Sequence, residues 1–557
     1  MIRLFQTNEV RKVEDLEGMW DFCVDNHENS DRGENFSLPV PGCWETHPKL
    51  NKYRGVGEYR RTIVLSESAN LRFVFKGISH TTQIYFDGIK IAEHYNAYTA
   101  FTAIVRKAEA GSHELIVKVD NSFHQDSSLH IPNDYYTYGG IIRPVALEHI
   151  ADTFIERIQF TPFQVEGQWH ADIQVVIDNL SDYAQQVRLE GELCGVKLQF
   201  ETIEVGPGRS TIATEHHFPN AEEWALENPR LYLLKVKLFE PGKNEPVDDL
   251  IERVGFRTIT THDARIQLND RDIVLKGFNR HEDHPAVGAA FPLSLMAHDL
   301  ELIIASGSNC VRTSHYPNDE RFLDLCDEKG IVVWEENHAR GLSLEQMQHP
   351  LFAQQCEDVN REMVEQHANH PSIIIWGVLN ECASDTLEGR AHYERQLKQI
   401  RAMDASRPLT FATHHRDKEL CLDLADIVSY NLYPGWYTDE DPGELCDQAR
   451  AWADAAGGAG KPMILSEFGG DGYYGHRDAT RVRGTEERQA DIIDANLSAY
   501  ISKSYLSGML IWQFCDCRVA ESTGWLLSRA GTQNSKGIVD RYRRPKLAYA
   551  VVQKHFL

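Results

Sequence analysis

The sequence lacks any apolar run that is long enough to cross a membrane. Its longest apolar segments, such as residues 371–379, fall far short of the roughly 20 residues that a transmembrane helix needs. The first fifteen residues also lack the apolar stretch of a secretory signal. We therefore expect a cytoplasmic protein that has no membrane partner.

The cysteines lack the spacing of a disulfide framework or of a metal site. Their number, eleven, is odd, and they are scattered at irregular intervals. Cys515 and Cys517 lie close together in the sequence, but no second cysteine or histidine pair accompanies them. We expect reduced and mostly buried thiols, no metal and no other cofactor.

Basic residues are scarce relative to acidic ones. The 57 lysines and arginines are outnumbered by 83 aspartates and glutamates, so the formal net charge is −26. This charge repels polyanions, which argues against nucleic acid as a partner. An anionic small-molecule substrate would need a local cluster of cations to overcome the mean field of the protein.

A chain of 557 residues is too long for a single hydrophobic core, and the character of this sequence changes twice. Residues 1–150 contain short alternating strands bounded by turn signals such as Asp87-Gly88, which predict a β-sandwich. Residues 151–259 form a second all-β stretch of about one hundred residues, a length typical of an immunoglobulin-like sandwich.

Residues 260–557 alternate between short apolar strands and amphipathic stretches such as 318–329 and 486–500. The eight strand candidates are 273–278, 309–313, 330–334, 373–379, 409–413, 427–430, 463–466 and 508–514. Eight strand–helix units in this length predict a closed (β/α)8 TIM barrel rather than an open sheet. In that fold the carboxyl ends of the strands build the active site.

Two glutamates lie at the ends of predicted barrel strands. Asn380-Glu381 follows the fourth strand, and Ser466-Glu467 ends the seventh. Glycoside hydrolysis needs one carboxylic acid to protonate the leaving oxygen and one carboxylate to attack or to activate water. A single glutamate at a strand end would more often pair with a neighbouring cation. Two at one rim favour a catalytic pair.

Several segments of the chain resemble glycoside hydrolase family 2, which contains β-galactosidases, β-mannosidases and β-glucuronidases. The matching segments are 276–285, 309–317, 369–381 and 464–469 in the predicted barrel, and 41–44 and 138–143 nearer the start. The resemblance spans the whole chain. It implies a jelly-roll sandwich over 1–150, an immunoglobulin-like sandwich over 151–259 and the barrel over 260–557.

The family pattern implies a retaining double displacement through a covalent glycosyl-enzyme, with Glu381 as acid/base and Glu467 as nucleophile. Asn380 resembles the residue that hydrogen-bonds the sugar 2-hydroxyl. Arg312 and Tyr433 resemble groups that keep the nucleophile ionised and oriented. Because a nearby cation lowers the pKa of a carboxyl group, we expect a low pKa for Glu467.

A short segment after the eighth strand bears on the choice of sugar. Asn534 and Lys536 resemble the Asn-X-Lys feature with which β-glucuronidases bind the uronate carboxylate, and such a charge-assisted pair would supply the required local cation. Elsewhere this tripeptide would be an ordinary solvated loop. Five further positions resemble sugar contacts: Asp134, Tyr433, Tyr437, Trp512 and Arg529. The loop before Arg529 differs in length by one residue from the β-glucuronidase pattern.

The sequence departs from the β-glucuronidase pattern after the third strand, over residues 335–340. Arg340 stands roughly where β-galactosidases carry an acidic magnesium ligand, and a guanidinium has no lone pair for a metal. Two interpretations remain open. Arg340 pairs with Glu335 or Glu336 at the rim, or it enters the pocket and contacts the uronate or its C4 hydroxyl. The second would move the preference from glucuronides to galacturonides.

The resemblance therefore predicts an exo-β-D-uronidase that acts on terminal β-glucuronides, β-galacturonides or both. The alternatives are a β-galactosidase or β-mannosidase of the same family, and a non-catalytic carbohydrate-binding protein, which the presence of both glutamates disfavours. The short segment between strands three and four predicts an open leaving-group side with room for an oligosaccharide. Because relatives are often dimers or tetramers, a homo-oligomer is also expected. His414 and His415 lack a spaced third metal ligand, which favours a structural or sugar-contacting role.

Overall fold

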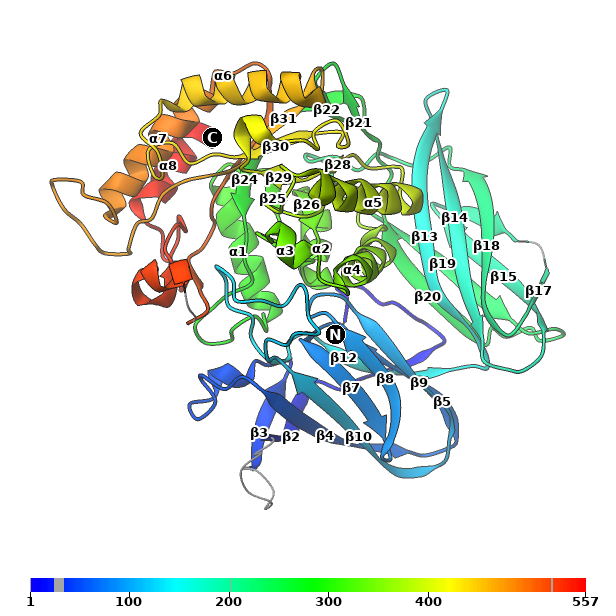
Figure 1. Ribbon diagram of the computed structural model, residues 1–557. Helices are drawn as coiled ribbons and strands as arrows, with labels where there is room; N and C mark the ends of the chain where they lie inside the picture. The colour runs from blue at the N-terminus through cyan, green and yellow to red at the C-terminus, as the bar shows by residue number, and fades with distance from the viewer. Residues whose placement is uncertain (1, 25–34, 201, 522–523) are drawn as a thin grey trace.

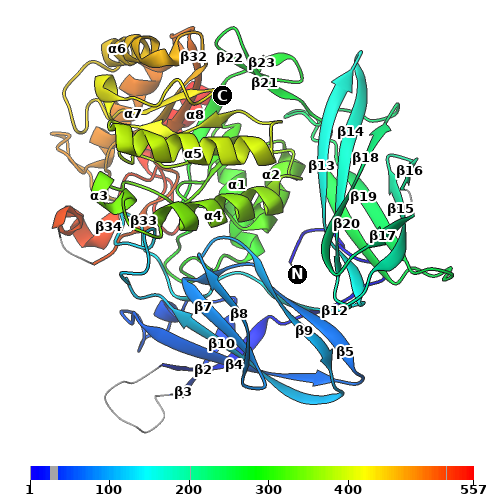
Figure 2. The same cartoon turned by 45° about the vertical axis from the view of Figure 1, so that its right-hand side comes forward.

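The computed structural model describes residues 2–24, 35–200, 202–521 and 524–557. Two β-sandwiches precede a barrel surrounded by helices (Figure 1). After rotation by 45°, the first sandwich lies below the barrel and the second lies beside it (Figure 2). Among the described residues, no helix has the length and apolar character required to span a membrane.

The first sandwich consists of a four-stranded sheet of order β1-β12-β5-β9 and a six-stranded sheet of order β3-β2-β4-β10-β7-β8, with β11 paired to β6. The strands are β1 (Lys12–Asp15), β2 (Gly18–Val24), β3 (Asn35–Val40), β4 (Val56–Leu65), β5 (Ala69–Phe75), β6 (Ile78–Ser79), β7 (Thr81–Phe86), β8 (Ile89–Tyr95), β9 (Phe101–Ala108), β10 (Gly111–Asp120), β11 (Gly140–Ile141) and β12 (Val145–Ile150). In β10 the apolar side chains alternate inward, so Leu115, Val117 and Val119 are buried in the core. Asp87 and Gly88 both have positive φ and close the β7–β8 hairpin, as their sequence predicted.

The second sandwich packs the three-stranded sheet β13-β14-β18 against a five-stranded sheet built on β16-β15-β19-β20, with β17 paired to β15. The strands are β13 (Thr153–Val165), β14 (Gln168–Asn179), β15 (Gln185–Leu193), β16 (Val196–Gln199), β17 (Ile203–Val205), β18 (Gly208–His217), β19 (Tyr232–Phe239) and β20 (Asp248–Val254). Ile173, Val175 and Ile177 of β14 share its core with Val236 of β19. Alternating apolar residues thus account for this sandwich as well.

A small antiparallel sheet of β21 (Ile259–His262), β22 (Arg265–Leu268) and β23 (Arg271–Ile273) leads into the barrel. The barrel strands are β24 (Leu275–Asn279), β25 (Cys310–Arg312), β26 (Val332–Glu336), β27 (Ile373–Gly377), β28 (Leu409–Thr410), β29 (Ala412–Thr413), β30 (Val428–Asn431), β31 (Met463–Phe468) and β32 (Leu506–Ile511). All pair in parallel, and β24 pairs with both β25 and β32. Since β28 and β29 are two halves of one strand separated by Phe411, the predicted eight-stranded TIM barrel is confirmed.

The helices around the barrel are α1 (Leu293–Ala305), α2 (Glu320–Lys329), α3 (Leu344–Met347), α4 (Phe352–His367), α5 (Leu387–Met403), α6 (Pro442–Ala453), α7 (Glu486–Ile501) and α8 (Leu547–Phe556). Helix α2 begins after Asp319, whose side chain accepts the Arg321 N–H, and ends at Gly330 in the left-handed conformation. The expectation of a helix after every strand is wrong at one place. Residues 414–427, between β29 and β30, contain only the short turn η2 (Arg416–Lys418).

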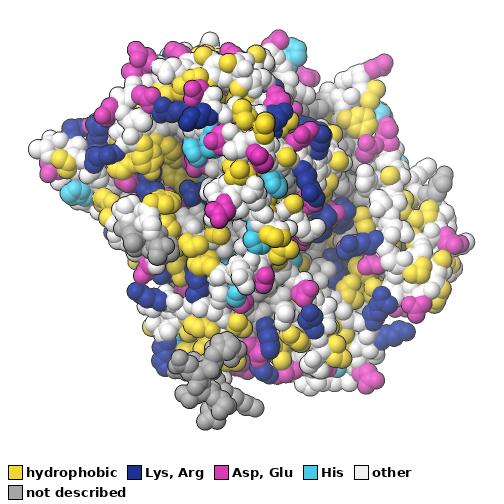
Figure 3. Space-filling view, viewed as in Figure 1, with side chains coloured by type: hydrophobic (Ala, Val, Ile, Leu, Met, Phe, Trp, Pro, Cys, Tyr) yellow, Lys and Arg dark blue, Asp and Glu magenta, His cyan; other side chains and the backbone are white. Residues whose placement is uncertain are grey.

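The surface mixes both signs of charge. Figure 3 shows acidic and basic side chains interspersed over one face of the molecule. At the junction of the first sandwich and the barrel, the buried Arg143 donates to Glu282 at 2.9 Å and to the carbonyl oxygen of Pro317 at 2.7 Å. The loop that follows β10, residues 121–139, also lies against the barrel, since Tyr138 donates to Asp283 at 2.9 Å and Asp134 accepts from Asn534 at 2.8 Å. It contributes residues to the site described next.

Candidate active site

Glu381 and Glu467 both lie at the carboxyl end of the barrel. Glu467 lies within β31 and is 4% exposed, whereas the side chain of Glu381, in the loop after β27, is 18% exposed. The Glu381 backbone is in the left-handed region with φ 52°, and its N–H donates to the carbonyl oxygen of Ala412 at 2.9 Å. Such a conformation is unusual for a residue with a side chain and fixes the direction of the carboxyl group.

Each oxygen of Glu467 accepts a hydrogen bond from one of the two residues expected to support it. Arg312 Nη1 donates to Oε1 at 2.9 Å, and the Tyr433 hydroxyl donates to Oε2 at 2.7 Å. Arg312 is itself held by Glu336, whose two oxygens each accept a guanidinium N–H at 2.9 Å. This bidentate pair leaves Arg312 little freedom, so the orientation of Glu467 is fixed through it.

Asn431, the last residue of β30, connects the two halves of the site. Its Nδ2 donates to Glu381 Oε1 at 2.8 Å and to Asn380 Oδ1 at 3.2 Å, and its Oδ1 accepts the Ser466 hydroxyl at 2.8 Å. Sequence reasoning missed Asn431, although its place at a strand end is the same signal that identified the two glutamates.

His414, which was not among the predicted catalytic residues, lies close to Glu381. His414, the first residue after β29, places Nδ1 at 3.6 Å from Glu381 Oε1. Its neighbour His415 is turned away and bonds the carbonyl oxygen of Cys382 at 2.9 Å. The pair was expected to be structural or sugar-contacting, and the two histidines in fact have different surroundings.

The two carboxyl groups have oppositely shifted pKa values. Burial and the negative charge of Glu381 raise the pKa of Glu467 to about 7, against the effect of Arg312. Burial acts on Glu381 too, but the hydrogen bond and charge of His414 lower its pKa overall. The expected low pKa of Glu467 is therefore wrong in its net sign, because burial and the second carboxylate outweigh the guanidinium. Below about pH 7 the pair therefore holds one proton.

Several buried polar atoms around the pair have no hydrogen-bond partner among the described residues. They are Asn380 Nδ2, His315 Nε2 and Arg340 Nε. Buried polar groups are normally satisfied, and leaving one unpaired costs free energy. A cluster of such atoms beside two carboxyl groups fits a ligand that carries several hydroxyl groups.

Asp134 of the first sandwich reaches the barrel end and bonds two of the expected site residues. Its carboxylate accepts Arg529 Nε at 2.9 Å and Nη2 at 2.5 Å, and it also accepts Asn534 Nδ2 at 2.8 Å. Asn534 lies in β34 (Gln533–Asn534), which pairs with β33 (Cys517–Arg518). The first sandwich and the C-terminal part of the chain thus meet at the carboxyl end of the barrel.

Lys536 is 1% exposed, and within the described parts of the chain its ammonium group has one carboxylate partner, Asp471, at 3.1 Å. The Nζ atom also lies 5.2 Å from the ring centroids of Trp436 and Tyr437, a cation–π distance. Tyr437 is 60% exposed, which places it at the mouth of the pocket. Trp512, which follows β32, is buried and stacks on His315 with ring centroids 5.0 Å apart.

Arg340 does not pair with either neighbouring glutamate, so the rim-pairing interpretation is wrong. Glu335 accepts His367 at 2.8 Å, and Glu336 is engaged by Arg312. Arg340 instead donates from Nη1 to Asn133 Oδ1 of the first sandwich at 2.6 Å. Sequence reasoning could not have found this contact because its two residues belong to different bodies of the fold.

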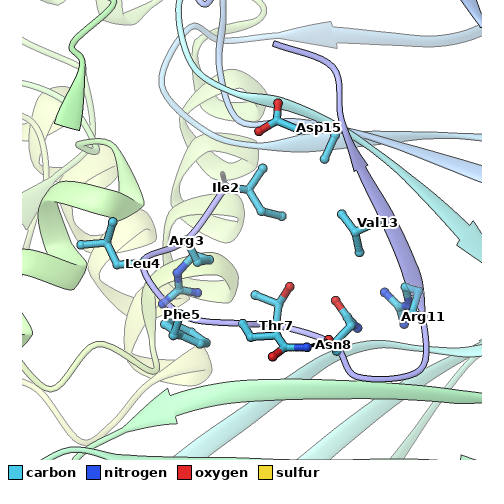
Figure 4. Close-up of a pocket in the computed structure, with 11 residues that line it drawn as sticks. Ile2, Arg3, Leu4, Phe5, Thr7, Asn8, Arg11, Val13 and Asp15 are labelled. Carbon is cyan, nitrogen blue, oxygen red and sulfur yellow. Dashed lines mark hydrogen bonds between the residues drawn. The ribbon is translucent and has the colours of Figure 1, made fainter.

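Two hollows open on either side of Glu381 and His414, which line both. One of about 310 Å³ includes Asn431, Tyr433 and Tyr437, and one of about 360 Å³ includes Arg340. A larger cavity of about 520 Å³ lies under the N-terminal segment and is lined by residues between Ile2 and Asp15 and by Ala146 (Figure 4). It shares no lining residue with the two hollows and contains neither glutamate.

Asp324, Asp327 and His370 form the one group of potential metal ligands within the described parts of the chain. Arg3 already bonds both oxygens of Asp324, at 3.0 and 2.8 Å, and His370 bonds Asp327 at 2.6 Å. These contacts form an ion-pair network that anchors the N-terminal segment to the barrel.

A closed parallel barrel with two glutamates at its carboxyl end, surrounded by unpaired polar atoms, defines the class of glycoside hydrolases. The chain belongs to glycoside hydrolase family 2: the family model described as its TIM barrel domain matches residues 259–557, and the model described as Glycosyl hydrolases family 2 matches residues 153–257. The predicted family and fold class are therefore confirmed, and the chain is an enzyme that hydrolyses glycosides.

Known proteins similar to this chain include both kinds of uronidase. The structure of a family 2 β-galacturonidase from Eisenbergiella tayi bound to galacturonate is 44% identical, covers 100% of this chain and 99% of that one, and has a TM-score of 0.96. The β-glucuronidase of Sus scrofa is 27% identical and covers 99% of this chain and 91% of its own length. A β-glucuronidase structure from Ruminococcus gnavus shares the fold at 24% identity, with a TM-score of 0.86 over 100% of this chain and 99% of that one.

Proposed function

We propose that the protein is a retaining exo-β-D-uronidase that removes terminal β-linked uronic acids, with galacturonides preferred over glucuronides. The observation that carries this proposal is the placement of Glu381 and Glu467 at the carboxyl end of the barrel together with the buried cation of Lys536, which lies 5.2 Å from the ring of Tyr437 in the hollow beside Glu381. The galacturonide preference is supported by the 44% identity to the β-galacturonidase, against 27% to the β-glucuronidase of Sus scrofa.

In the first step Glu467 attacks the anomeric carbon while Glu381 gives its proton to the glycosidic oxygen, and the leaving group departs. In the second step Glu381 takes a proton from water, the water oxygen attacks the anomeric carbon, and Glu467 leaves. Two inversions give net retention. Arg312 and Tyr433, which bond the two oxygens of Glu467, stabilise the carboxylate that departs in the second step.

The first step needs the shared proton on Glu381, although the pKa shifts place it on Glu467 before substrate binds. The form with the proton on Glu381 and the form with the proton on Glu467 have the same net charge. Substrate binding therefore has only to move the proton from one carboxyl group to the other. A glycosidic oxygen beside Glu381 accepts a hydrogen bond from the protonated carboxyl and favours that form. The tight contacts of Glu467 with Arg312 and Tyr433 favour its ionised form at the same moment.

The uronate carboxylate is proposed to bind at Lys536 and Asn534. Lys536 is almost fully buried and shares its charge with Asp471 alone among the described carboxylates within 4.0 Å. A substrate carboxylate can therefore form a strong charge-assisted bond there in spite of the acidic protein. Asn380 Nδ2, which is buried without a partner among the described residues, is positioned to donate to the sugar 2-hydroxyl.

A panel of 4-nitrophenyl β-D-galacturonide, glucuronide, galactoside and mannoside tests the proposal. We expect turnover of the uronides, with the galacturonide fastest, and loss of activity in Glu467→Gln. The anomer formed first, followed by NMR, should be β. Turnover of a neutral glycoside without uronide turnover would mean a β-galactosidase or β-mannosidase instead, and binding without any turnover would mean a carbohydrate-binding protein. An α anomer would exclude retention.

A further inference from the structure

Loop 121–139 leaves the first sandwich after β10 and returns to it at β11, and it contains neither helix nor strand. Asn133 and Asp134, which bond residues of the barrel, lie well inside this loop. Their positions therefore depend on how the two ends of the loop are held. A connection of this kind has considerable conformational freedom, which the fold must restrict before such contacts can form.

The side chain of Glu45 holds both ends of this loop. Glu45 lies in the short turn η1 (Trp44–Thr46) and is 5% exposed. Its Oε1 accepts Asn121 Nδ2, at the first residue of the loop, at 3.1 Å. Its two oxygens also accept the N–H of Gly139, the last residue of the loop, at 2.9 and 3.0 Å. One carboxyl group therefore joins the points at which the loop leaves and re-enters the sandwich.

The surroundings leave these two ends little room to move. Asn121 is fully buried, and its Oδ1 accepts the Gly55 N–H at 3.0 Å. The carbonyl oxygen of Gly139 accepts the Trp44 N–H at 3.1 Å, and a Cβ built at Gly139 would lie 2.1 Å from the Trp44 ring. Both ends are therefore fixed in a tightly packed part of the first sandwich.

Glu45 is a costly group for such a place. Burial raises its pKa to about 8, although backbone hydrogen bonds and the charges of Arg54 and Arg518 act in the opposite direction. In the unfolded chain the same carboxyl group is ionised above about pH 4.5, so its burial costs stability at neutral pH. Groups with strongly perturbed pKa values cluster at functional sites, which favours a role for Glu45 beyond packing.

We propose that Glu45 is a positioning residue for uronate binding. By holding loop 121–139, it keeps Asp134 in contact with Asn534. Asn534 Oδ1 in turn accepts the Lys536 N–H at 3.2 Å, so the loop supports both residues that are proposed to bind the carboxylate. This inference rests on the proposed uronidase function. It adds to that function a residue of the first sandwich that lines neither of the two hollows.

The test is Glu45→Ala, measured with 4-nitrophenyl β-D-galacturonide. Because the uronate carboxylate is remote from the bonds that change, a loosened site should weaken the binding of substrate and transition state alike. KM should therefore rise about fivefold or more, while kcat changes less than about twofold. A variant that is only less stable would contain less active enzyme, which lowers the apparent kcat and leaves KM unchanged. Glu45→Gln keeps an acceptor for Gly139 and Asn121, so its KM should stay within about threefold of wild type.

Hydrogen exchange of the backbone provides a readout that does not depend on activity. In Glu45→Ala the amides of residues 121–139 should exchange about fivefold faster or more, since Gly139 loses its acceptor. The matched control is Glu148→Ala, because Glu148 is also 5% exposed in the first sandwich but bonds Arg11 and Arg72. It should change neither KM nor the exchange of this loop.

An unchanged KM in Glu45→Ala, or wild-type exchange over residues 121–139, would overturn the inference. If Glu45→Ala does not fold, Asn121→Ala takes its place, because it removes one of the bonds to Glu45. Its KM should rise about threefold, and an unchanged KM would overturn the inference equally. If the wild-type enzyme neither hydrolyses nor binds a uronide, the uronidase function fails and the uronate role of Glu45 fails with it. Faster exchange in Glu45→Ala would then still show that Glu45 holds the loop.

Discussion

At the scale of single residues, the environment of Glu381 determines how the enzyme responds to pH. His414 contacts Glu381 and is the main cause of its lowered pKa, and the carboxylate in turn raises the pKa of His414. Other charged groups that act on this imidazole are Glu467, which raises its pKa, and Arg340, which lowers it. The histidine thus takes part in the proton distribution of the catalytic pair.

Replacing His414 with asparagine should move both limbs of the pH profile of kcat/KM to higher pH. Without the imidazolium, the pKa of Glu381 rises. Each protonation step of the Glu381–Glu467 pair then occurs at a higher pH. The profile should be measured with phenyl β-D-galacturonide, whose poor leaving group needs the acid. His415→Asn is the control, because His415 bonds a backbone carbonyl instead. Equal profiles for both variants and the wild type would contradict this role.

Arg340 is the residue expected to set the preference at C4. Its Nε is buried without a partner among the described side chains, and its Nη1 is fixed by Asn133. Arg340→Ala should lower the galacturonide-to-glucuronide ratio of kcat/KM by about tenfold or more, since a hydrogen bond to a charged group contributes about 1.5–3 kcal/mol. Arg340→Lys keeps the charge but loses the planar fork and should give an intermediate ratio. An unchanged ratio in Arg340→Ala would refute the assignment.

The positions of Glu381 and Glu467 could be predicted from sequence because the signal was the end of a barrel strand, whereas Arg312 was expected only from the family resemblance. The contacts between the first sandwich and the barrel could not be predicted, because no local sequence pattern connects Asn133 to Arg340, 207 residues further along the chain. The net pKa shift of Glu467 also escaped prediction. It depends on burial and on a second carboxylate, not on the nearest cation alone.

At the scale of elements, the end of α2 is tied to the second sandwich. Gly330 has φ 69°, and a Cβ built there would lie 2.1 Å from the carbonyl oxygen of Leu226. Gly330→Ala should therefore lower the free energy of unfolding by about 2–5 kcal/mol, which sums a left-handed conformation and an overpacked contact. The measurement is urea unfolding followed by tryptophan fluorescence.

Gly460 provides the matched control for this substitution. Its φ is 75°, but a Cβ there would meet nothing within 4 Å. Gly460→Ala should cost only about 1–2 kcal/mol, the conformational part alone. Equal losses of stability at the two positions would show that the contact with Leu226 contributes nothing.

The order of elements was predictable because apolar runs and amphipathic stretches alternate clearly over most of the barrel. The prediction failed at residues 414–427, where counting units implied a helix and the chain forms only η2. Cys421, Leu422, Ala425 and Ile427 of this connection are buried through tertiary contacts, whereas Leu420 and Asp423 beside and between them are exposed. A short segment that is buried through its tertiary contacts has little local pattern by which it could be recognised.

At the scale of the whole molecule, neutral histidines are buried where the first sandwich meets the barrel. His338 lies 5.9 Å from His80 and 5.5 Å from Tyr98 between ring centroids. Both of its ring nitrogens lack a hydrogen-bond partner among the described atoms. Burial lowers the pKa of His338 to about 3. Below about pH 6.5 the unfolded chain therefore takes up a proton at this residue that the folded protein refuses.

His338→Phe should make the protein less sensitive to acid than the wild type. As the pH falls from about 6.5 to about 4.5, the free energy of unfolding of the variant minus that of the wild type should rise by about 1.4 kcal/mol per pH unit. Comparing the two proteins cancels the other titrating groups. The control is His262→Phe, the same substitution at a side chain that is 68% exposed, and the pH dependence of His338→Phe should exceed that of this control. A constant difference for His338→Phe would contradict the prediction.

The bond between Asp134 and Arg529 spans 395 residues, and that between Asp134 and Asn534 spans 400. A ribosome that adds about 5–20 residues per second needs about 20–80 s to make the segment between them. The second sandwich and most of the barrel emerge during that interval without a finished pocket. A nascent chain that stalls before the last thirty residues lacks both Arg529 and Asn534, so truncated translation products should release no sugar in the cell.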